Sequence, residues 1–221
     1  MASTSTSSIQ NNIKCDVFLS FKGQDTPKTF VDNLYHALQQ KGITTFKYDE
    51  RIKKEHVIAS DQQTTETRRN IMDYLIRFIE DSKFHIIVLS KNYVSSSWCL
   101  DELVKIMECH KTAKHIVYPI FYDVEPTEVR HQYGPVGEAL ATHVEDEQIK
   151  RWKDALNEAA NLVGWELNAL DSITHRLEMK FIQEIVQDIS LKLSLINWKF
   201  DEKLVGMDTR TKNVDMYELM V

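Results

Sequence analysis

Residues 84–89 have the sequence Phe-His-Ile-Ile-Val-Leu, and this apolar run is the clearest strand signal in the chain. A continuously apolar strand is typical of a parallel sheet that is covered on both faces. Further apolar runs at residues 15–21, 43–46 and 116–121 predict three more strands on either side of it. Pro119, within the last run, suggests a bulge or an edge position.

Segments with apolar residues at helical spacing separate these strands. The predicted helices cover residues 30–38, 71–79, 100–107, 136–144, 149–163 and 174–196. Strands that alternate with helices predict an α/β fold with a doubly wound parallel sheet. Trp152, Trp165 and Trp198 are assigned to helix faces or ends, where core packing is the default interpretation.

The composition excludes several classes of protein. The chain has 221 residues, with 27 Lys plus Arg, 33 Asp plus Glu, a formal charge of −6 and 43% hydrophobic residues. That hydrophobic fraction is enough for a packed core and excludes collagen-like and wholly disordered chains. A net acidic chain lacks the basic footprint typical of nucleic-acid binding. No apolar run approaches the ~20 residues that cross a bilayer.

The cysteines and the N-terminal residues indicate an intracellular protein. Cys15, Cys99 and Cys109 are odd in number and lack the spacing of a zinc site, so we expect reduced thiols, no metal site and no cofactor. Residues 1–12 are rich in Ser, Thr, Asn and Gln and predict a disordered leader, without the apolar run of a signal peptide. Ala2 excludes N-myristoylation, which needs Gly there. We expect a cytoplasmic location, with the nucleus left open.

Familiar nucleotide-binding loops are absent from the end of the first predicted strand. Residues 20–25, Ser-Phe-Lys-Gly-Gln-Asp, contain neither GxGxxG nor GxxxxGK[ST]. Ser90 stands where a phosphate-receiving domain would need an aspartate after its third strand. His85 and His115 begin strands, and we interpret both as structural or solvent-facing rather than as catalytic bases.

Residues 95–103, Ser-Ser-Ser-Trp-Cys-Leu-Asp-Glu-Leu, are the segment with the strongest functional signal. They follow the third predicted strand and so lie at the edge where doubly wound sheets bind ligands. One of the serines is expected to cap a helix whose first turn holds Asp101 and Glu102. Acidic residues there complement the helix dipole, which is the simpler interpretation. A tryptophan beside a carboxylate also suits the stacking of a base or sugar, and composition alone does not choose between the two.

Four segments in order resemble the plant Toll/interleukin-1 receptor (TIR) domain. They are Asp-Val-Phe-Leu-Ser-Phe-Lys-Gly-Gln-Asp-Thr at 16–26, Ser-Lys-Asn-Tyr-Val-Ser-Ser-Ser-Trp-Cys-Leu-Asp-Glu-Leu at 90–103, Pro-Ile-Phe-Tyr-Asp-Val-Glu-Pro-Thr-Glu-Val-Arg at 119–130, and the final-helix segment at 151–165. The resemblance covers residues 13–190. It implies a flavodoxin-like doubly wound parallel sheet of about five strands with helices on both faces.

The resemblance implies the following organisation. The TIR domain occupies residues 13–168, a helical extension residues 169–198, and a linker-like tail residues 199–221. Within the tail, residues 204–210, Leu-Val-Gly-Met-Asp-Thr-Arg, resemble the stretch ahead of the nucleotide-binding module in TIR-type resistance receptors. The chain is thus similar to a receptor truncated after its TIR domain or to a TIR-only protein.

Members of this family are NAD(P)+ glycohydrolases that become active when TIR domains assemble. The resemblance therefore implies cleavage of the nicotinamide–ribose bond of NAD+ or NADP+, giving ADP-ribose and cyclic or variant nucleotides in plant immune signalling. The catalytic glutamate of the Trp-Cys-Leu-x-Glu-Leu motif maps to Glu102. The matching substrate-binding positions are Lys22, Gly23, Asp25, Ser96 and Trp98. The implied partners are NAD(P)+ and other TIR domains, as homo- or hetero-oligomers. From its composition the chain is expected to have no membrane partner, and it gives no direct evidence for nucleic acid.

The chain departs from the family pattern at several of these positions. Lys22 replaces an arginine, Gln24 a glutamate and Pro27 another arginine, so the loop loses a bidentate phosphate donor. On the first helix, Asp32 and Asn33 replace the Ser-His pair of the assembly face. These changes favour an alternative function, in which a catalytically weak TIR module seeds or caps assemblies.

The largest departure is the loop at residues 48–69, which gates the pocket and bridges subunits in the family. Lys53-Lys54 stands where the family has Arg-Gly, and an insertion follows near residues 59–69. The insertion is either a disordered flap or an N-terminal extension of the next helix. Threonine caps at residues 64, 65 or 67 favour the extension.

Overall fold

A computed structural model of the chain describes residues 15–23, 28–47, 65–113, 115–143, 147–167 and 174–205. Five parallel strands form one sheet in the order β2-β1-β3-β4-β5. Their bounds are Val17–Phe21 for β1, Thr45–Lys47 for β2, Phe84–Ser90 for β3, Ile116–Tyr122 for β4 and Trp165–Leu167 for β5. The predicted fold class, a doubly wound sheet of about five strands, is confirmed.

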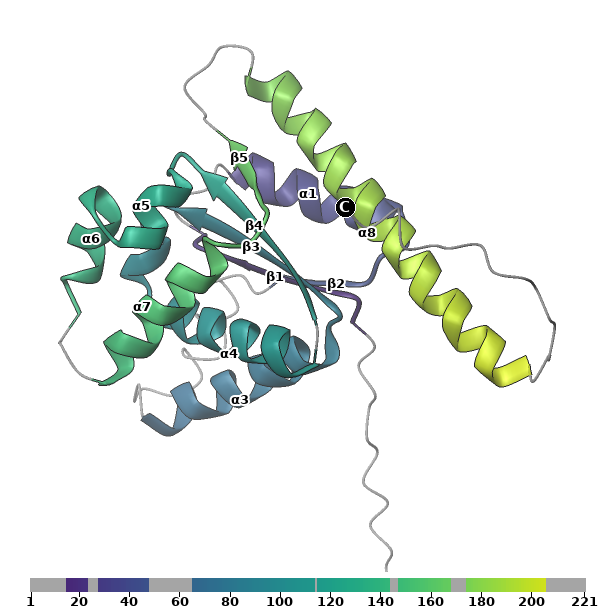
Figure 1. Ribbon diagram of the computed structural model, residues 1–221, viewed down its shortest axis with the longest axis horizontal. Coiled ribbons are helices and arrows are strands. Elements are labelled where there is room, and N and C mark those ends of the chain that lie inside the picture. The colour runs from purple at the N-terminus through teal and green to yellow at the C-terminus, as the bar shows by residue number, and fades with distance from the viewer. Residues whose placement is uncertain are drawn as a thin grey trace, which may run out of the picture.

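Helices cover both faces of this sheet (Figure 1). Their bounds are Lys28–Gln40 for α1, Thr65–Asp81 for α3, Ser97–Ala113 for α4, Pro126–His131 for α5, Gly134–Leu140 for α6, Glu147–Ala159 for α7 and Thr174–Val205 for α8, with a 3-10 turn η1 at Tyr93–Ser95. α1 and α8 pack together on one face, while α3, α4 and α7 cover the other. α8 runs on past residue 198 as one helix.

The strand sequences explain the two layers. All seven residues of β3 are buried, as its continuous apolar run predicts for a central strand. In β1, Val17 and Leu19 join the core beneath α1 and α8, whereas Phe18 joins the core beneath α3 and α4. Ser20 therefore belongs to the face that α4 covers, because side chains alternate along a strand.

β5 was not predicted from the pattern, and the placement of Trp165 at a helix end was wrong. The three residues Trp165–Leu167 pair with Ile120–Tyr122 of β4. Gly164 permits this close approach, because a Cβ there would lie 2.4 Å from the carbonyl oxygen of Pro119. A strand of three residues carries too little periodicity to be identified in advance.

The expectation for Pro119 was also wrong. β4 is an interior strand, and its seven residues pair with β3 in unbroken register, with Pro119 opposite Ile87. Pro119 lies just before the first β4 residue that pairs with β5, so it interrupts neither ladder. The segment after β4, where no helix was predicted, contains α5.

α3 begins at Thr65, so residues 65–69 extend this helix rather than forming a flap. This supports the second of the two alternatives for that part of the insertion. Lys53, Lys54 and residues 59–64 lie outside the described residues, as do Gln24, Asp25 and Pro27.

Candidate functional site

The candidate site lies where the carboxyl ends of β1 and β3 meet the beginning of α4. The strand order changes direction between β1 and β3, and this switch point is where doubly wound sheets bind ligands. Lys22 and Gly23 follow β1 directly, and η1 and α4 follow β3. Both segments singled out in the sequence therefore reach one edge of the sheet.

Ser96 caps α4, as the sequence predicts for this serine cluster. Its backbone is extended, its Oγ accepts a hydrogen bond from the Cys99 N–H at 3.4 Å, and its carbonyl accepts one from the Leu100 N–H at 3.0 Å. The expectation that Asp101 and Glu102 lie in the first turn was wrong, because the helix begins at Ser97 and its first turn has no acidic residue. The dipole interpretation of these carboxylates therefore loses its basis.

Glu102 is buried, with 6% of its surface exposed, and its Oε2 accepts a hydrogen bond of 2.7 Å from the Oγ of Ser20. α4 thus directs the Glu102 carboxylate into the protein, toward Ser20 near the end of β1. A buried carboxylate needs such partners, since its desolvation is costly. In a medium of low dielectric, its charge also acts more strongly on a nearby cation.

A second hydroxyl extends this contact. The OH of Tyr93 lies 2.9 Å from the Oγ of Ser20 and 3.0 Å from the carbonyl oxygen of Cys99. Ser20 and Tyr93 are each 1% exposed. Burial, followed by the neighbouring Cys99 and Glu102, raises the pKa of the Tyr93 phenol well above its ordinary value, so it stays a hydrogen-bond donor.

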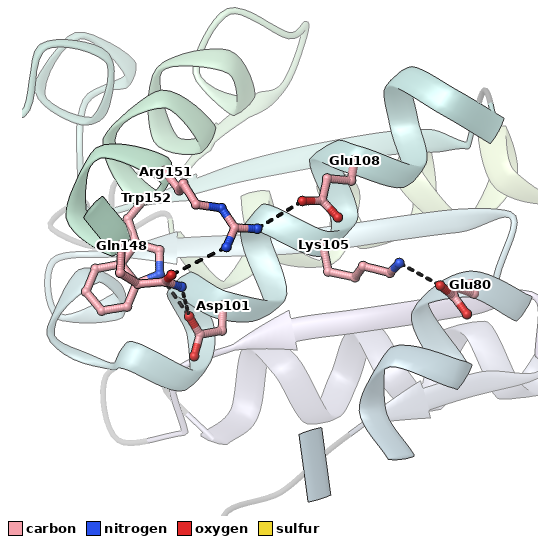
Figure 2. Close-up of polar contacts among 7 residues, drawn as sticks. All are labelled: Glu80, Asp101, Lys105, Glu108, Gln148, Arg151 and Trp152. Atoms are coloured by element: carbon pink, nitrogen blue, oxygen red, sulfur yellow. Dashed lines mark hydrogen bonds and ion pairs between the residues drawn. The ribbon is translucent and has the colours of Figure 1, made fainter. Parts of the chain in front are cut away.

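Asp101 points away from this network, toward α7 (Figure 2). Its Oδ1 accepts hydrogen bonds from the Nε1 of Trp152 at 2.9 Å and the Nε2 of Gln148 at 2.7 Å. Consecutive residues on a helix lie about 100° apart, so the two carboxylates face different elements. Trp152 is buried on a helix face, as predicted, and its indole N–H is satisfied by Asp101.

Ion pairs attach α4 to its neighbours beyond Asp101 (Figure 2). Arg151 on α7 contacts Glu108 at 3.1 Å, and Lys105 contacts Glu80 at the end of α3. The hydrogen bond to Glu80 raises the pKa of Lys105. Pairs of this exposure add little stability each, but together they fix how α4 lies against α3 and α7.

Trp98 lies one helical turn before Glu102 and is half-buried against the core between the sheet and α4. Residues at this spacing occupy the same helix face, so both side chains belong to the side of α4 that meets the sheet. Lys22 and Gly23 are half-buried at the end of β1. Among the described residues, chain neighbours apart, a Cβ on Gly23 would come within 4 Å of one atom, a ring carbon of Phe21 at 3.8 Å.

The predicted interface residues lie on α1. Asp32 is half-exposed and accepts a contact of 2.6 Å from the Nζ of Lys47 on β2. The same ammonium lies 4.9 Å from the ring centroid of Tyr35. Asn33 is half-buried. Asp32 is thus engaged within the chain.

A hollow of about 110 Å³ lies beside the candidate site, at the ends of β3 and β4. Its lining residues are Ser90, Lys91, Asn92, Tyr122 and Asp123, to none of which the sequence analysis gave a role in a site. Asp123 has a φ of 51°, an uncommon backbone for a non-glycine residue. Within the described ranges, no three His, Cys, Asp or Glu residues form a metal site, and no helix is long and apolar enough to cross a membrane.

Ser20 and Tyr93 are the residues that sequence reasoning missed. A serine at the buried end of an apolar strand was the available signal, because a hydroxyl in a core needs a partner. The contact between them spans 73 positions and that between Ser20 and Glu102 spans 82, so no local pattern reveals either.

Comparisons with known proteins show which family the chain belongs to. The TIR domain family matches residues 14–217. The chain is 43% identical over 215 residues to the disease resistance protein RPV1 of Vitis rotundifolia, covering 96% of this chain and 14% of that protein. It is 41% identical over 220 residues to the TMV resistance protein N of Nicotiana glutinosa, covering 97% and 17%.

A solved structure resembles the fold as well. The TIR domains of the activated Roq1 resistosome, which recognises the pathogen effector XopQ, match with a TM-score of 0.62 and 39% identity, covering 79% of this chain and 99% of that one. The chain spans only about a sixth of the length of the curated relatives it matches, 14% and 17% in the two named here. Because the family match takes in both the sheet and the segment around Glu102, this chain belongs to the TIR domain family.

Proposed function

We propose that the chain cleaves the nicotinamide–ribose bond of NAD+ or NADP+ and acts in plant immune signalling when TIR domains associate. The observation that carries the proposal is the buried Glu102 carboxylate, which Ser20 holds at the switch point of the sheet one helical turn from Trp98. The similarity to plant disease resistance proteins supports the immune role. The cytoplasmic location expected from the sequence is part of the same proposal.

The chemistry needs one carboxylate in this position. The glycosidic C–N bond breaks, nicotinamide leaves as a neutral molecule with the bonding electron pair, and the ribose carbon takes on oxocarbenium character. The negative charge of Glu102 stabilises that cation. Water then adds to the ribose carbon and releases a proton, giving ADP-ribose, whereas a ring nitrogen of the same nucleotide in place of water gives a cyclic product.

The remaining proposed roles concern the substrate. Lys22 offers a cation to the phosphates, although without the paired donors of an arginine. Trp98 offers a ring for stacking beside the ribose or the base. Gly23, Asp25 and Ser96 complete the proposed substrate-binding set, with Ser96 holding the start of α4 in place.

A second candidate function is a TIR interaction module with weak or no catalysis. The observation that favours it is on α1, where Asp32 replaces the family's usual residue. Its carboxylate pairs with Lys47 of the same chain. In this case the chain would associate with other TIR domains through a changed α1 surface and limit or seed their assembly.

Nicotinamide release separates the two candidates. The purified chain, concentrated and with a crowding agent, is incubated with NAD+ and separately with NADP+, beside Glu102→Ala. The enzyme proposal predicts release by the wild-type chain that is lost in Glu102→Ala. Release by neither protein, with self-association established by light scattering, would favour the interaction module.

A further inference from the structure

Three buried side chains from separate segments meet behind the candidate site. Ser20 comes from β1, Tyr93 from η1 and Glu102 from α4, and their exposed fractions are 1%, 1% and 6%. The Oγ of Ser20 lies between the other two groups, at 2.7 Å from the Oε2 of Glu102 and 2.9 Å from the OH of Tyr93. Their surroundings are apolar core residues of β1, β3 and α4.

The hydrogens available fix the direction of these contacts. A carboxylate oxygen can only accept a hydrogen bond, so Ser20 donates its one hydroxyl hydrogen to Glu102. The Tyr93 phenol has one hydrogen and two acceptors within reach, the Cys99 carbonyl oxygen at 3.0 Å and the Ser20 oxygen at 2.9 Å. Ser20 thus donates to Glu102, while Tyr93 donates to the Cys99 carbonyl and shares its hydrogen with the Ser20 oxygen. Hydrogen bonds in such a chain reinforce one another when they end on a charge.

We propose that Ser20 and Tyr93 are positioning residues for Glu102: they hold one oxygen of its carboxylate and stabilise its ionised form. This inference rests on the proposed function, since it explains how a buried glutamate stays charged and oriented for a cationic reaction centre. The titratable groups next to this carboxylate include the Tyr93 phenol, which interacts with both Glu102 and the Cys99 thiol.

The most direct test follows the ionisation of Glu102 without needing activity. Full-length chain labelled with carboxyl-¹³C glutamate is titrated by NMR, and the Glu102 signal is assigned by its loss in Glu102→Gln. The titration midpoint of this signal is expected to rise by about one pH unit in Ser20→Ala, because a hydrogen bond to the charged form is lost. Tyr93→Phe is expected to raise it by less, since the Ser20 contact remains.

Matched variants separate positioning from a general loss of packing. Ser20→Thr keeps the hydroxyl and is expected to restore the wild-type midpoint. Ser82→Ala removes a buried serine at the opposite end of the sheet, before β3, and Tyr118→Phe removes a phenol that contacts Asp188 and Lys192 on α8. Both controls are expected to leave the Glu102 midpoint unchanged.

The NMR titration and the nicotinamide assay fail independently. If the wild-type chain releases no nicotinamide, the proposed function fails, while the titration still tests the positioning contacts. If the wild-type chain does release nicotinamide, the acidic limb of the profile of kcat against pH is expected to shift in each variant with the NMR midpoint, while KM is unchanged. An unchanged midpoint in both Ser20→Ala and Tyr93→Phe would overturn the inference, and so would an equal shift in the two controls. Should Ser20→Ala not fold, Tyr93→Phe alone decides in the same way.

Discussion

At the residue scale, the two adjacent carboxylates on α4 make different contacts. Glu102 points to β1 and its hydroxyl partner, whereas Asp101 binds α7 through Trp152 and Gln148. Helix geometry alone separates the two side chains by about 100°. It could not supply their partners, which lie 82, 51 and 47 positions away in the chain.

Asp101→Ala is therefore expected to reduce stability and leave chemistry intact. The buried indole N–H of Trp152 would lose its acceptor, which typically costs about 1–3 kcal/mol of the free energy of unfolding. Urea unfolding measures this loss, with Asp154→Ala, an exposed aspartate on α7, as the control. A stability equal to that of the control would show that the Asp101 contacts carry no net energy.

His85 makes stability depend on pH. It is fully buried on β3, and its Nε2–H donates to the carbonyl of Ile79 at 2.9 Å, which confirms a structural role. Burial, and to a lesser degree the nearby His115 and His110, lowers the pKa of His85 from 6.5 to about 4. Above pH 6.5 neither state of the chain is protonated at this group. Between pH 6.5 and about 4 only the unfolded state binds the proton, so stability falls as the pH falls.

The loss of unfolding free energy that His85 causes between pH 7 and pH 4 is expected to be on the order of 3 kcal/mol. In His85→Phe the slope of unfolding free energy against pH should flatten over this interval, whatever the variant's stability at pH 7. The exposed His36→Ala serves as the control and should retain the wild-type slope. A slope that does not change in His85→Phe would assign the acid sensitivity to other groups.

At the element scale, long or strongly apolar segments were predictable and short ones were not. The apolar run of β3 and the serine cap of α4 indicated their elements correctly. β5 has three residues and α5 has six, so neither completes two periods of its pattern. For α5 a signal existed, because Glu125 and Glu128 form a reciprocal capping box around Pro126.

Gly164→Ala tests how β5 attaches to the sheet. The new Cβ would lie 2.4 Å from the Pro119 oxygen and 2.8 Å from its Cγ, and the neighbouring backbone of β4 has no room to move. A loss of about 1–3 kcal/mol in unfolding free energy is expected from such overpacking. Gly23→Ala, whose nearest contact would be 3.8 Å away, is the stability control. Equal stability of the two variants would mean that β5 shifts to admit the methyl group.

At the scale of the whole molecule, α8 completes the core beneath the sheet. Its buried residues Ile182, Ile185, Val186, Ile189 and Leu193 face α1 and the strands. Two tyrosines of β4 also bond to it, Tyr118 to Asp188 and Tyr122 to Glu178. The helical stripe was visible in the sequence, but the tyrosine contacts were not, because they join residues 70 and 56 positions apart.

A chain that ends at residue 173 is accordingly expected to lose cooperative unfolding, because the apolar faces of α1 and β4 would be exposed to water. Thermal unfolding followed by near-ultraviolet circular dichroism measures this. A chain that ends at residue 205 keeps α8 and is the control. A cooperative transition of wild-type midpoint in the shorter chain would contradict the role given to α8.

The central claim is that Glu102, and not its neighbour, carries out cleavage of NAD+. The decisive measurement compares nicotinamide release per folded molecule in wild type, Glu102→Gln and Asp101→Ala under identical assembling conditions. We expect Glu102→Gln to lose a factor on the order of 10²–10³ in rate, as for removal of one preorganised electrostatic group. Asp101→Ala should retain the wild-type rate. Release by Glu102→Gln at the wild-type rate would contradict the account.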